Sequence, residues 1–277
     1  MSTGAIAWIA GQWGPPDELR IPLNDRGLLL ADGLFETVLI EQGEPQLLAA
    51  HIARWHQSAA WLQMPAPPTL EVVQSLAREA VQRSGITTGA LRLNWSRGSG
   101  GRGIDLPSDG GTPCFWLQLS AAQPAFGPIT AIVSPSERRC GSSLLSRCKT
   151  FAYGPSIQAR RQAQAAGAHD ALLESTAGGL CCGTTANLLV EIEGQWFTPA
   201  LSSGCLPGVM RQHALELGLV AEAAEAIELN AVTEGRVTAA WLINSLGCRP
   251  LQSLNEHRLA RCNEGEAEHV WRGLLTP

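Results

Sequence analysis

LFETVLIEQGEPQLLAAHIARWHQSAAWLQM, residues 34–64, joins a strand pattern to a helix pattern. Residues 34–48 are rich in apolar side chains and predict strand structure, with a turn at Gln42-Gly43-Glu44-Pro45. Over 47–64 the apolar residues recur at helical spacing, which predicts an amphipathic helix. A strand that leads directly into a helix predicts a mixed α/β domain.

The same alternation continues on both sides of this stretch. Residues 5–13 predict a strand with a turn at Gly11-Gln12, and 69–85 predict a second helix with Thr69 as its N-cap. The second half predicts helices near 154–167, over GVMRQHALELG and over GEAEHVWRGLL. Further strands are predicted over LRLNWS, CFWLQLS, ITAIVS, HDALLES, NLLVEIEG, QWFTP, AAWLINSL and CRPLQSL.

These patterns favour two domains of α/β or α+β class. The segment AAQPAFGP, residues 121–128, breaks the alternation and is the best candidate for a linker. We therefore expect a smaller N-terminal α/β domain over 1–120 and a larger C-terminal domain over 129–277. Ligand sites are common where two domains meet, so we expect the functional site between them.

Composition excludes several classes of protein. The net charge of −5 with scattered arginines gives no basic track for a nucleic acid. The N-terminus has no basic segment of a signal peptide, and no apolar run approaches the roughly 20 residues of a membrane helix. The eight cysteines lack the spacing of a zinc site, so we expect reduced thiols, no metal and a cytoplasmic protein.

Lys149 is the only lysine among 20 basic side chains, and Tyr153, four residues later, is the only tyrosine. Arginine cannot act as an amine nucleophile because its guanidinium is never deprotonated, whereas a lysine amine can condense with a carbonyl. Lys149 is therefore a candidate for Schiff-base chemistry. The alternative is a single surface lysine that persists by chance.

SRGSGGRGID contains Gly98, Gly100 and Gly103 in the spacing of a dinucleotide fingerprint. That fingerprint needs a helix directly after the glycines, and here turn residues follow. The loop instead carries Arg97 and Arg102, whose forked donors suit a carboxylate-bearing substrate. A plain surface loop with solvated arginines is the alternative.

LPGVMRQHALELG places Pro207 and Gly208 at the start of a predicted helix. The backbone amides of Val209 and Met210 would then point toward an anion, favoured by the helix dipole. Any helix that begins in this way has the same property. Pyridoxal 5′-phosphate would satisfy both features, since it offers an aldehyde to Lys149 and a phosphate to the helix N-terminus.

The chain resembles the fold-type IV pyridoxal-phosphate enzymes, the class IV aminotransferase family. Within that family, SRGSGGRG and LINSLGCRP are most similar to the 4-amino-4-deoxychorismate lyases. The resemblance spans about residues 24–252 and is carried, in family order, by NDRGLLLADGLFETV, HIARW, KTFAY, GAHDALLEST, GTTANLLV and GCLPGVMRQ.

The resemblance implies a role for individual residues. Lys149 would hold the cofactor covalently, Arg54 would contact its phosphate and Tyr153 would hydrogen-bond its phenolate oxygen. Asn187 would support the phosphate-binding loop. The remaining implied phosphate contacts are the amides of Val209 and Met210 and a side-chain donor from Asn244 or Ser245, while Arg97 and Arg102 would bind substrate carboxylates.

One position departs from the family. Where its members usually carry a glutamate that keeps a proton on the pyridine nitrogen, this chain has Cys182, and Cys181 beside it supplies no carboxylate either. A thiol stabilises a charged ring much less well. Aromatisation of the product can drive a lyase reaction with a weaker electron sink, so Cys182 favours a lyase.

The resemblance therefore implies a homodimeric lyase that converts 4-amino-4-deoxychorismate to 4-aminobenzoate and pyruvate, a step in folate biosynthesis. The alternatives are a branched-chain or D-amino-acid aminotransferase and a weakly active protein that binds the cofactor.

Overall fold

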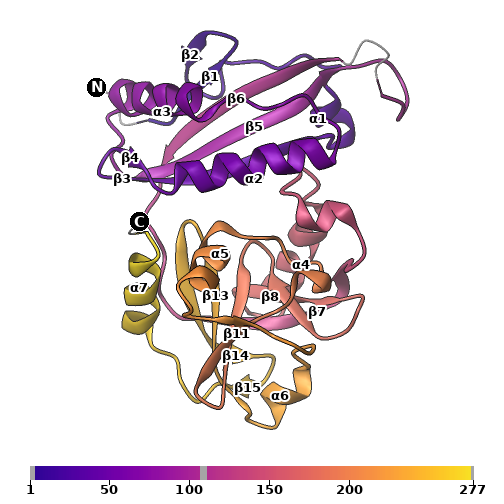
Figure 1. Ribbon diagram of the computed structural model, residues 1–277, viewed down its shortest axis with the longest axis vertical. Helices are drawn as coiled ribbons and strands as arrows, with labels where there is room; N and C mark the ends of the chain where they lie inside the picture. Colours follow the sequence, from indigo (N-terminus) through magenta and orange to yellow (C-terminus); the bar gives the residue numbers. More distant parts are fainter. Residues whose placement is uncertain (1–3, 107–110, 276–277) are drawn as a thin grey trace. The chain divides into compact units, whose positions relative to one another are not determined.

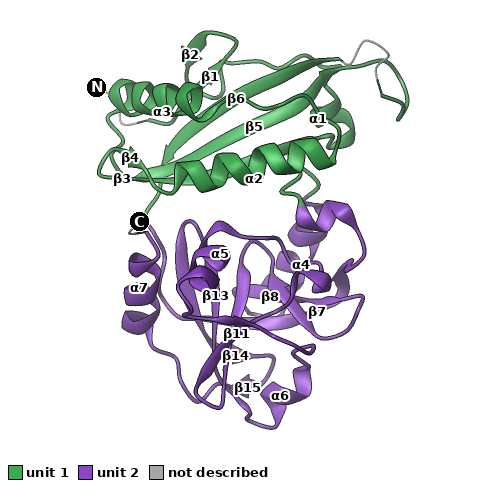
Figure 2. Ribbon diagram, viewed as in Figure 1, with its two compact units in different colours: residues 1–123, 148–152 green, residues 124–147, 153–277 purple. Residues whose placement is uncertain are grey.

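The computed structural model describes residues 4–106 and 111–275, which divide into two compact units (Figure 2). One unit comprises residues Met1–Gln123 together with Cys148–Ala152. The other comprises Pro124–Arg147 and Tyr153–Pro277. The first crossing between the units, at Gln123 and Pro124, lies within the stretch 121–128.

The first unit is an antiparallel sheet with two of its helices, α2 and α3, packed on one face. Its described strands are ordered β2-β1-β6-β5-β3-β4, and Figure 1 shows α2 running along the sheet. The elements are β1 (Ile6–Ile9), β2 (Gln12–Gly14), α1 (Arg26–Leu30), β3 (Gly33–Glu41), β4 (Glu44–Pro45), α2 (Leu48–Trp61), α3 (Leu70–Ser84), β5 (Gly89–Ser99) and β6 (Thr112–Ala121).

Alternation along the central strands decides which face of this sheet is buried beneath the helices. Leu34 and Val38 on β3, and Leu91 and Leu93 on β5, pack with residues of α2 and α3 in one core. Successive strand residues point to opposite faces, so Phe35 and its pairing partner lie on the face away from this core. Helix α3 starts after its predicted N-cap, Thr69.

The second unit is built on a larger mixed sheet. Its described elements are β7 (Ile129–Arg139), a 3-10 turn η1 (Leu144–Arg147), α4 (Gly154–Ala165), β8 (Asp170–Ser175), β9 (Leu180–Gly183), β10 (Asn187–Ile192), β11 (Gln195–Thr198), a second 3-10 turn η2 (Leu201–Ser203), α5 (Val209–Glu216), β12 (Ala221–Glu222), α6 (Leu229–Thr233), β13 (Val237–Asn244), β14 (Gly247–Leu254), β15 (His257–Arg258) and α7 (Glu264–Gly273).

This sheet closes on itself. Its strands follow the order β12-β11-β10-β13-β14-β7-β8-β9, and β9 also pairs with β10 through Cys182 and Asn187. The ring from β10 through β14 and β7 back to β9 surrounds an apolar core that includes Ile129, Leu188 and Leu251. Cys182 therefore lies where the ring closes.

The segment Cys148–Ala152 corrects the expectation that 129–277 belongs to one domain. Phe35 donates its backbone N–H to the Lys149 carbonyl at 2.9 Å, and Phe151 donates to Gly33 at 3.0 Å. A bridge between Leu34 and Thr150 lies between these bonds. The segment thus pairs with β3, which places Lys149 in the first unit.

Candidate active site

Lys149 is held against β3 by its side chain as well as by its backbone. Its Nζ lies 4.4 Å from the centroid of the Phe35 ring, a cation–π distance. The guanidinium carbon of Arg92 lies 3.7 Å from the same centroid, and Arg92 Nε donates to Asn94 Oδ1 at 2.8 Å. One buried ring therefore brings together the predicted nucleophile and an exposed arginine that sequence reasoning missed.

Glycine makes room for the segment that carries Lys149. A Cβ placed on Gly33 would lie 2.2 Å from Cε2 of Phe151, and one on Gly27 would lie 2.8 Å from the same atom. Both distances are shorter than any real contact of a Cβ atom, so the Phe151 ring occupies space that only glycine leaves open. This close approach allows the segment Cys148–Ala152 to pack against β3.

Arg54 belongs to a buried charged triad. Its Nε donates to Glu36 Oε1 at 2.8 Å, its Nη2 donates to Glu36 Oε2, and His51 Nδ1 lies 2.8 Å from Glu36 Oε2. His51 and Arg54 are three residues apart on α2 and so share a face of that helix. The sequence indicated Arg54 through HIARW but missed Glu36, whose burial on β3 appears only in the fold.

Burial and charge act in opposite directions on Glu36. Burial alone would raise the pKa of Glu36, but Arg54 and His51 together lower it from 4.5 to about 2. Burial lowers the pKa of His51 below its ordinary 6.5, against the raising effect of Glu36, and the Arg54 and Lys149 charges lower it further. The triad is therefore a carboxylate between a guanidinium and a neutral imidazole at neutral pH.

The buried Arg97 side chain is bonded within the first unit, and its contact with substrate stays a prediction. Its Nε donates to Asp32 Oδ2 at 2.8 Å, and its two terminal nitrogens donate to the carbonyls of Gln63 and Leu62 at 3.0 Å. These acceptors occupy the buried guanidinium, which fixes the start of the loop after β5. Arg102 is exposed within that loop.

The start of α5 has the shape that the sequence predicted. Gly208 is its N-cap, and Val209 and Met210 are buried in the first turn. A Cβ on Gly208 would lie 2.0 Å from Oδ1 of Asn187, and Asn187 Nδ2 donates to the Leu206 carbonyl at 2.8 Å. Asn187 therefore supports this loop, and only glycine fits between it and the helix.

Asn244 is the last residue of β13, and Ser245 lies in the turn that leads from it to β14. Asn244 Nδ2 donates to the Thr185 carbonyl at 3.3 Å, and its Oδ1 accepts from the Leu246 amide at 2.8 Å. The side chain of Asn244 therefore also shapes the turn. Tyr153, the remaining predicted contact in this unit, is the half-buried N-cap residue of α4.

Cys182 is buried on β9, a strand that the sequence analysis did not predict. It pairs with Leu173 on β8 and with Asn187 on β10. The interaction with Cys181, followed by burial, raises the pKa of the Cys182 thiol well above its ordinary value. Cys182 is therefore a neutral thiol at neutral pH.

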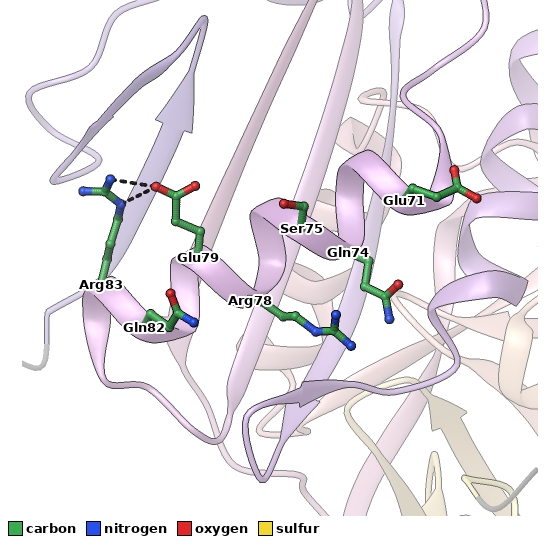
Figure 3. A pocket seen from close by; sticks show the side chains of 7 residues that line it. All are labelled: Glu71, Gln74, Ser75, Arg78, Glu79, Gln82 and Arg83. Carbon is green, nitrogen blue, oxygen red and sulfur yellow. Dashed lines mark hydrogen bonds and ion pairs between the residues drawn. The ribbon is translucent and has the colours of Figure 1, made fainter.

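The pocket drawn in Figure 3 is lined by none of the residues described above. It has a volume of about 570 Å³, and its lining side chains come from α3. Exposed polar and charged groups line it, including the ion pair of Arg83 with Glu79. None of the predicted site residues contributes to it, so we regard it as the solvated side of α3.

The chain is similar to known proteins over most of its length. The profile of the family described as amino-transferase class IV matches residues 33–254. A proposed aminodeoxychorismate lyase of Schizosaccharomyces pombe is 30% identical over 191 residues, covering 68% of this chain and 75% of that protein. A proposed branched-chain-amino-acid aminotransferase of Methanocaldococcus jannaschii is 28% identical over 212 residues, covering 76% and 73%. The structure of the Escherichia coli branched-chain amino acid aminotransferase matches with a TM-score of 0.87 at 19% identity, covering 99% of this chain and 95% of that one.

The chain belongs to the class IV amino-transferase family. The expected mixed α/β fold of fold-type IV is confirmed. The family uses pyridoxal 5′-phosphate, so the expected cofactor is confirmed, and the protein is an enzyme of this family. The names of its relatives divide between a lyase and a transaminase.

Across residues 4–106 and 111–275, none of the helices is long and apolar enough to cross a membrane.

Proposed function

We propose that this enzyme is a pyridoxal-phosphate-dependent lyase that converts 4-amino-4-deoxychorismate to 4-aminobenzoate and pyruvate. The observation that carries the proposal is Cys182, a buried thiol whose pKa is raised by Cys181 and by burial, so that it stays neutral. A neutral thiol at the ring nitrogen leaves the cofactor a weaker electron sink than a carboxylate does. A reaction whose product becomes aromatic needs that electron sink least.

Each unit carries residues that suit a part of the cofactor. Lys149 is an amine held on a rigid strand pairing, and the Arg54 guanidinium, oriented by Glu36, suits a phosphate. Gly208 leaves the first amides of α5 open to an anion, in a place where a Cβ would collide with Asn187. Within this proposal Tyr153 contacts the phenolate oxygen, and Ser245 rather than Asn244 adds a phosphate donor, because the Asn244 side chain already bonds the turn.

When bound, pyridoxal 5′-phosphate supplies an electron sink for the carbon that bears the substrate nitrogen. Lys149 then takes the proton from that carbon as general base. The electron pair left by that proton forms the last double bond of the ring, the enolpyruvyl oxygen leaves with the electrons of its bond to the ring, and the enolpyruvate takes up a proton to become pyruvate. The Phe35 ring keeps the Lys149 amine at the strand edge, where it can accept the proton.

Arg92 takes over the role that the sequence gave to Arg97. It is exposed and lies against the same ring as Lys149, so a carboxylate bound to it stays close to the amine. Arg102, on the loop after β5, remains the candidate for a second carboxylate. The substrate carries a ring carboxylate and an enolpyruvyl carboxylate, which two arginines can pair separately.

A branched-chain or D-amino-acid aminotransferase is the second candidate, favoured by the likeness to the aminotransferases named above. A weakly active cofactor-binding protein is the third. A homodimer belongs to the same proposal, since Leu28, Leu29 and Leu30 on α1 are exposed large apolar residues.

Product analysis of the holoprotein tests the proposal. Equimolar pyruvate and 4-aminobenzoate identify the lyase, and exchange between an amino acid and a keto acid identifies a transaminase. A bound cofactor without turnover of either kind identifies the third candidate.

A further inference from the structure

The face of the first sheet that lies away from α2 and α3 carries a row of large and polar side chains. In the register, Phe35 on β3 is paired with Asn94 on β5, and Asn94 is paired with Trp116 on β6. Directly paired residues of antiparallel strands share a face, so these three side chains lie in one row across the sheet. Adjacent strands lie roughly 4.8 Å apart, which separates Phe35 from Trp116 by roughly 10 Å.

Phe151 fills the space between the two aromatic residues. Its ring centroid lies 6.4 Å from that of Phe35 and 5.7 Å from that of Trp116, both in tilted geometry. Because Gly27 and Gly33 let the Phe151 ring approach the backbone closely, its position is fixed. Phe35, Phe151 and Trp116 therefore form a continuous row of aromatic rings, in which Phe35 is buried and Phe151 and Trp116 are partly exposed; we call this row the aromatic shelf.

The charged groups in contact with the Phe35 ring are positive, while the buried Asp25 carboxylate near Phe151 accepts from Ser96 and from the Leu28 amide. Lys149 Nζ and the Arg92 guanidinium both contact Phe35, at 4.4 and 3.7 Å from its centroid. The neighbouring residues of the same face, Thr37 beside Arg92 on β3 and Gln118 on β6, are uncharged. The combination is complementary to a ring that bears a carboxylate, with the ring on the aromatic side chains and the carboxylate on the arginine.

Trp116 differs from the fully buried Trp55 of the opposite face and shares with Trp8 a partly buried position. Trp55 is fully buried among the rings of Trp95 and Phe115, and Trp8 packs on Phe115. Trp116 retains partial exposure, although it is the largest apolar side chain of its row. Packing of the core alone therefore does not account for a tryptophan here.

We infer that Trp116 determines substrate specificity, by stacking on the ring of a cyclic carboxylate whose acid group is held by Arg92. This inference rests on the proposed function because it takes the reaction to occur at Lys149. It does not depend on whether that reaction is an elimination or a transamination. It names the substrate class, a ring-bearing carboxylate, and disfavours short acyclic amino acids. Phe151 acts as a positioning residue that keeps the shelf continuous up to Lys149.

Calorimetric titration of the holoprotein with benzoate and with butanoate tests the inference without any turnover. We expect wild type to bind benzoate more tightly than butanoate. Trp116→Leu should weaken benzoate binding by about three- to tenfold, the range of a lost aromatic pair, and change butanoate binding less than twofold. Trp116→Phe keeps a ring and should recover most of the affinity for benzoate.

Trp8→Leu is the matched control, because it removes a tryptophan from the helix-covered face of the same sheet. It should leave the ratio of the two affinities unchanged, whatever it does to stability. Trp116→Thr, a strand-forming replacement, provides the same comparison if the leucine variant is unstable.

Equal losses for both probes, or none, in the Trp116 variants would overturn the inference, as would a wild type that binds butanoate as tightly as benzoate. Preference for benzoate without formation of 4-aminobenzoate overturns the proposed lyase and leaves the aromatic shelf standing. Lyase turnover together with an unaltered ratio of the benzoate and butanoate affinities in Trp116→Leu would overturn the role of Trp116 and leave the proposed lyase standing.

Discussion

Lys149 and Phe35 are joined twice, by a 2.9 Å hydrogen bond from the Phe35 amide to the Lys149 carbonyl and by a 4.4 Å cation–π contact between the Lys149 Nζ and the Phe35 ring. The backbone hydrogen bond fixes the position of Lys149 along β3, and the contact with the Phe35 ring fixes the direction of its side-chain amine. An arginine in place of Lys149 could keep both contacts, since arginine also stacks on aromatic rings. A substitution of Lys149 by arginine can therefore remove the chemistry of the amine while the fold is kept.

Lys149→Arg should keep the fold and lose covalent attachment of the cofactor. Borohydride reduction of wild-type holoprotein should fix a pyridoxyl label on the peptide that contains Lys149, the only lysine in the chain. Mass spectrometry of the digest checks both proteins. A label found only on the N-terminal amine, or no label at all, rules out Lys149 as the attachment point.

Arg54→Ala should weaken binding of the cofactor by roughly ten- to a hundredfold, because a charge-assisted hydrogen bond is worth about 1.5–3 kcal/mol. Equilibrium dialysis with pyridoxal 5′-phosphate measures the change. Arg78→Ala is the control, since Arg78 is an exposed arginine of α3 with a loose 3.9 Å contact to Glu44. If both variants bind as wild type does, Arg54 serves only to neutralise Glu36.

Patterns in the sequence predicted those features of the fold that depend on residues close together in the chain. The helix after Thr69 and the glycine at the start of α5 follow from capping and from the spacing of apolar residues. The pairing of Thr150 with Leu34 joins residues more than a hundred positions apart, and no periodicity encodes such a register. It could not be predicted, so Lys149 was expected in the wrong unit.

The contacts at the site that the sequence did not predict have the same origin. Arg97 has the residue type and loop context of a ligand-binding arginine, but its acceptors are Asp32 and two carbonyls after α2, which only the fold brings near. Arg92 and Phe35 were missed because each occupies an ordinary strand position. Their importance arises from a contact between neighbouring strands.

The Glu36 triad predicts that acid destabilises the fold in two stages. The pKa of His51 is lowered from 6.5, so protonation favours the unfolded chain once the pH falls below 6.5. The pKa of Glu36 is lowered to about 2, so its contribution is complete above pH 4.5 and is lost between 4.5 and 2. Both groups make the folded state bind fewer protons than the unfolded state.

His51→Asn should remove the first stage. Urea unfolding of wild type should show the free energy of unfolding decreasing between pH 6.5 and 5, by up to about 1.4 kcal/mol per pH unit for one proton. The variant should decrease less over that range. His257→Asn, at an exposed position on β15, should follow wild type. Equal slopes for wild type and His51→Asn would contradict the assignment.

Gly208→Ala should damage the start of α5. The added Cβ would lie 2.0 Å from Asn187 Oδ1, so Asn187 must move and its bond to the Leu206 carbonyl must weaken. We expect a loss of about 1–3 kcal/mol in the free energy of unfolding, together with weaker binding of the cofactor. Gly273→Ala is the control, because no atom lies within 4 Å of a Cβ built there. Wild-type affinity and stability in Gly208→Ala would show that Asn187 can yield without consequence.

Cys182 provides the sharpest test of the reaction type. Under the proposed function the neutral Cys182 thiol leaves the ring nitrogen of the cofactor without a strong partner, and Cys182→Glu would supply the carboxylate that the family resemblance implies at this position. A charged ring stabilises carbanionic character for longer, which favours transfer of the amino group over simple elimination. We therefore expect transamination to rise in Cys182→Glu, while lyase turnover changes less.

Both activities should be measured in wild type and variant, with the absorption spectrum as the check on cofactor occupancy. Cys182→Ser keeps the size of the side chain without adding an acid, so it separates the effect of charge from that of the buried thiol pair with Cys181. A glutamate is larger than the 7% exposed cysteine that it replaces, so thermal unfolding must accompany the assays. Unchanged activities and an unchanged spectrum at full occupancy would mean that residue 182 does not face the ring nitrogen, and Cys182 would then give no support to a lyase.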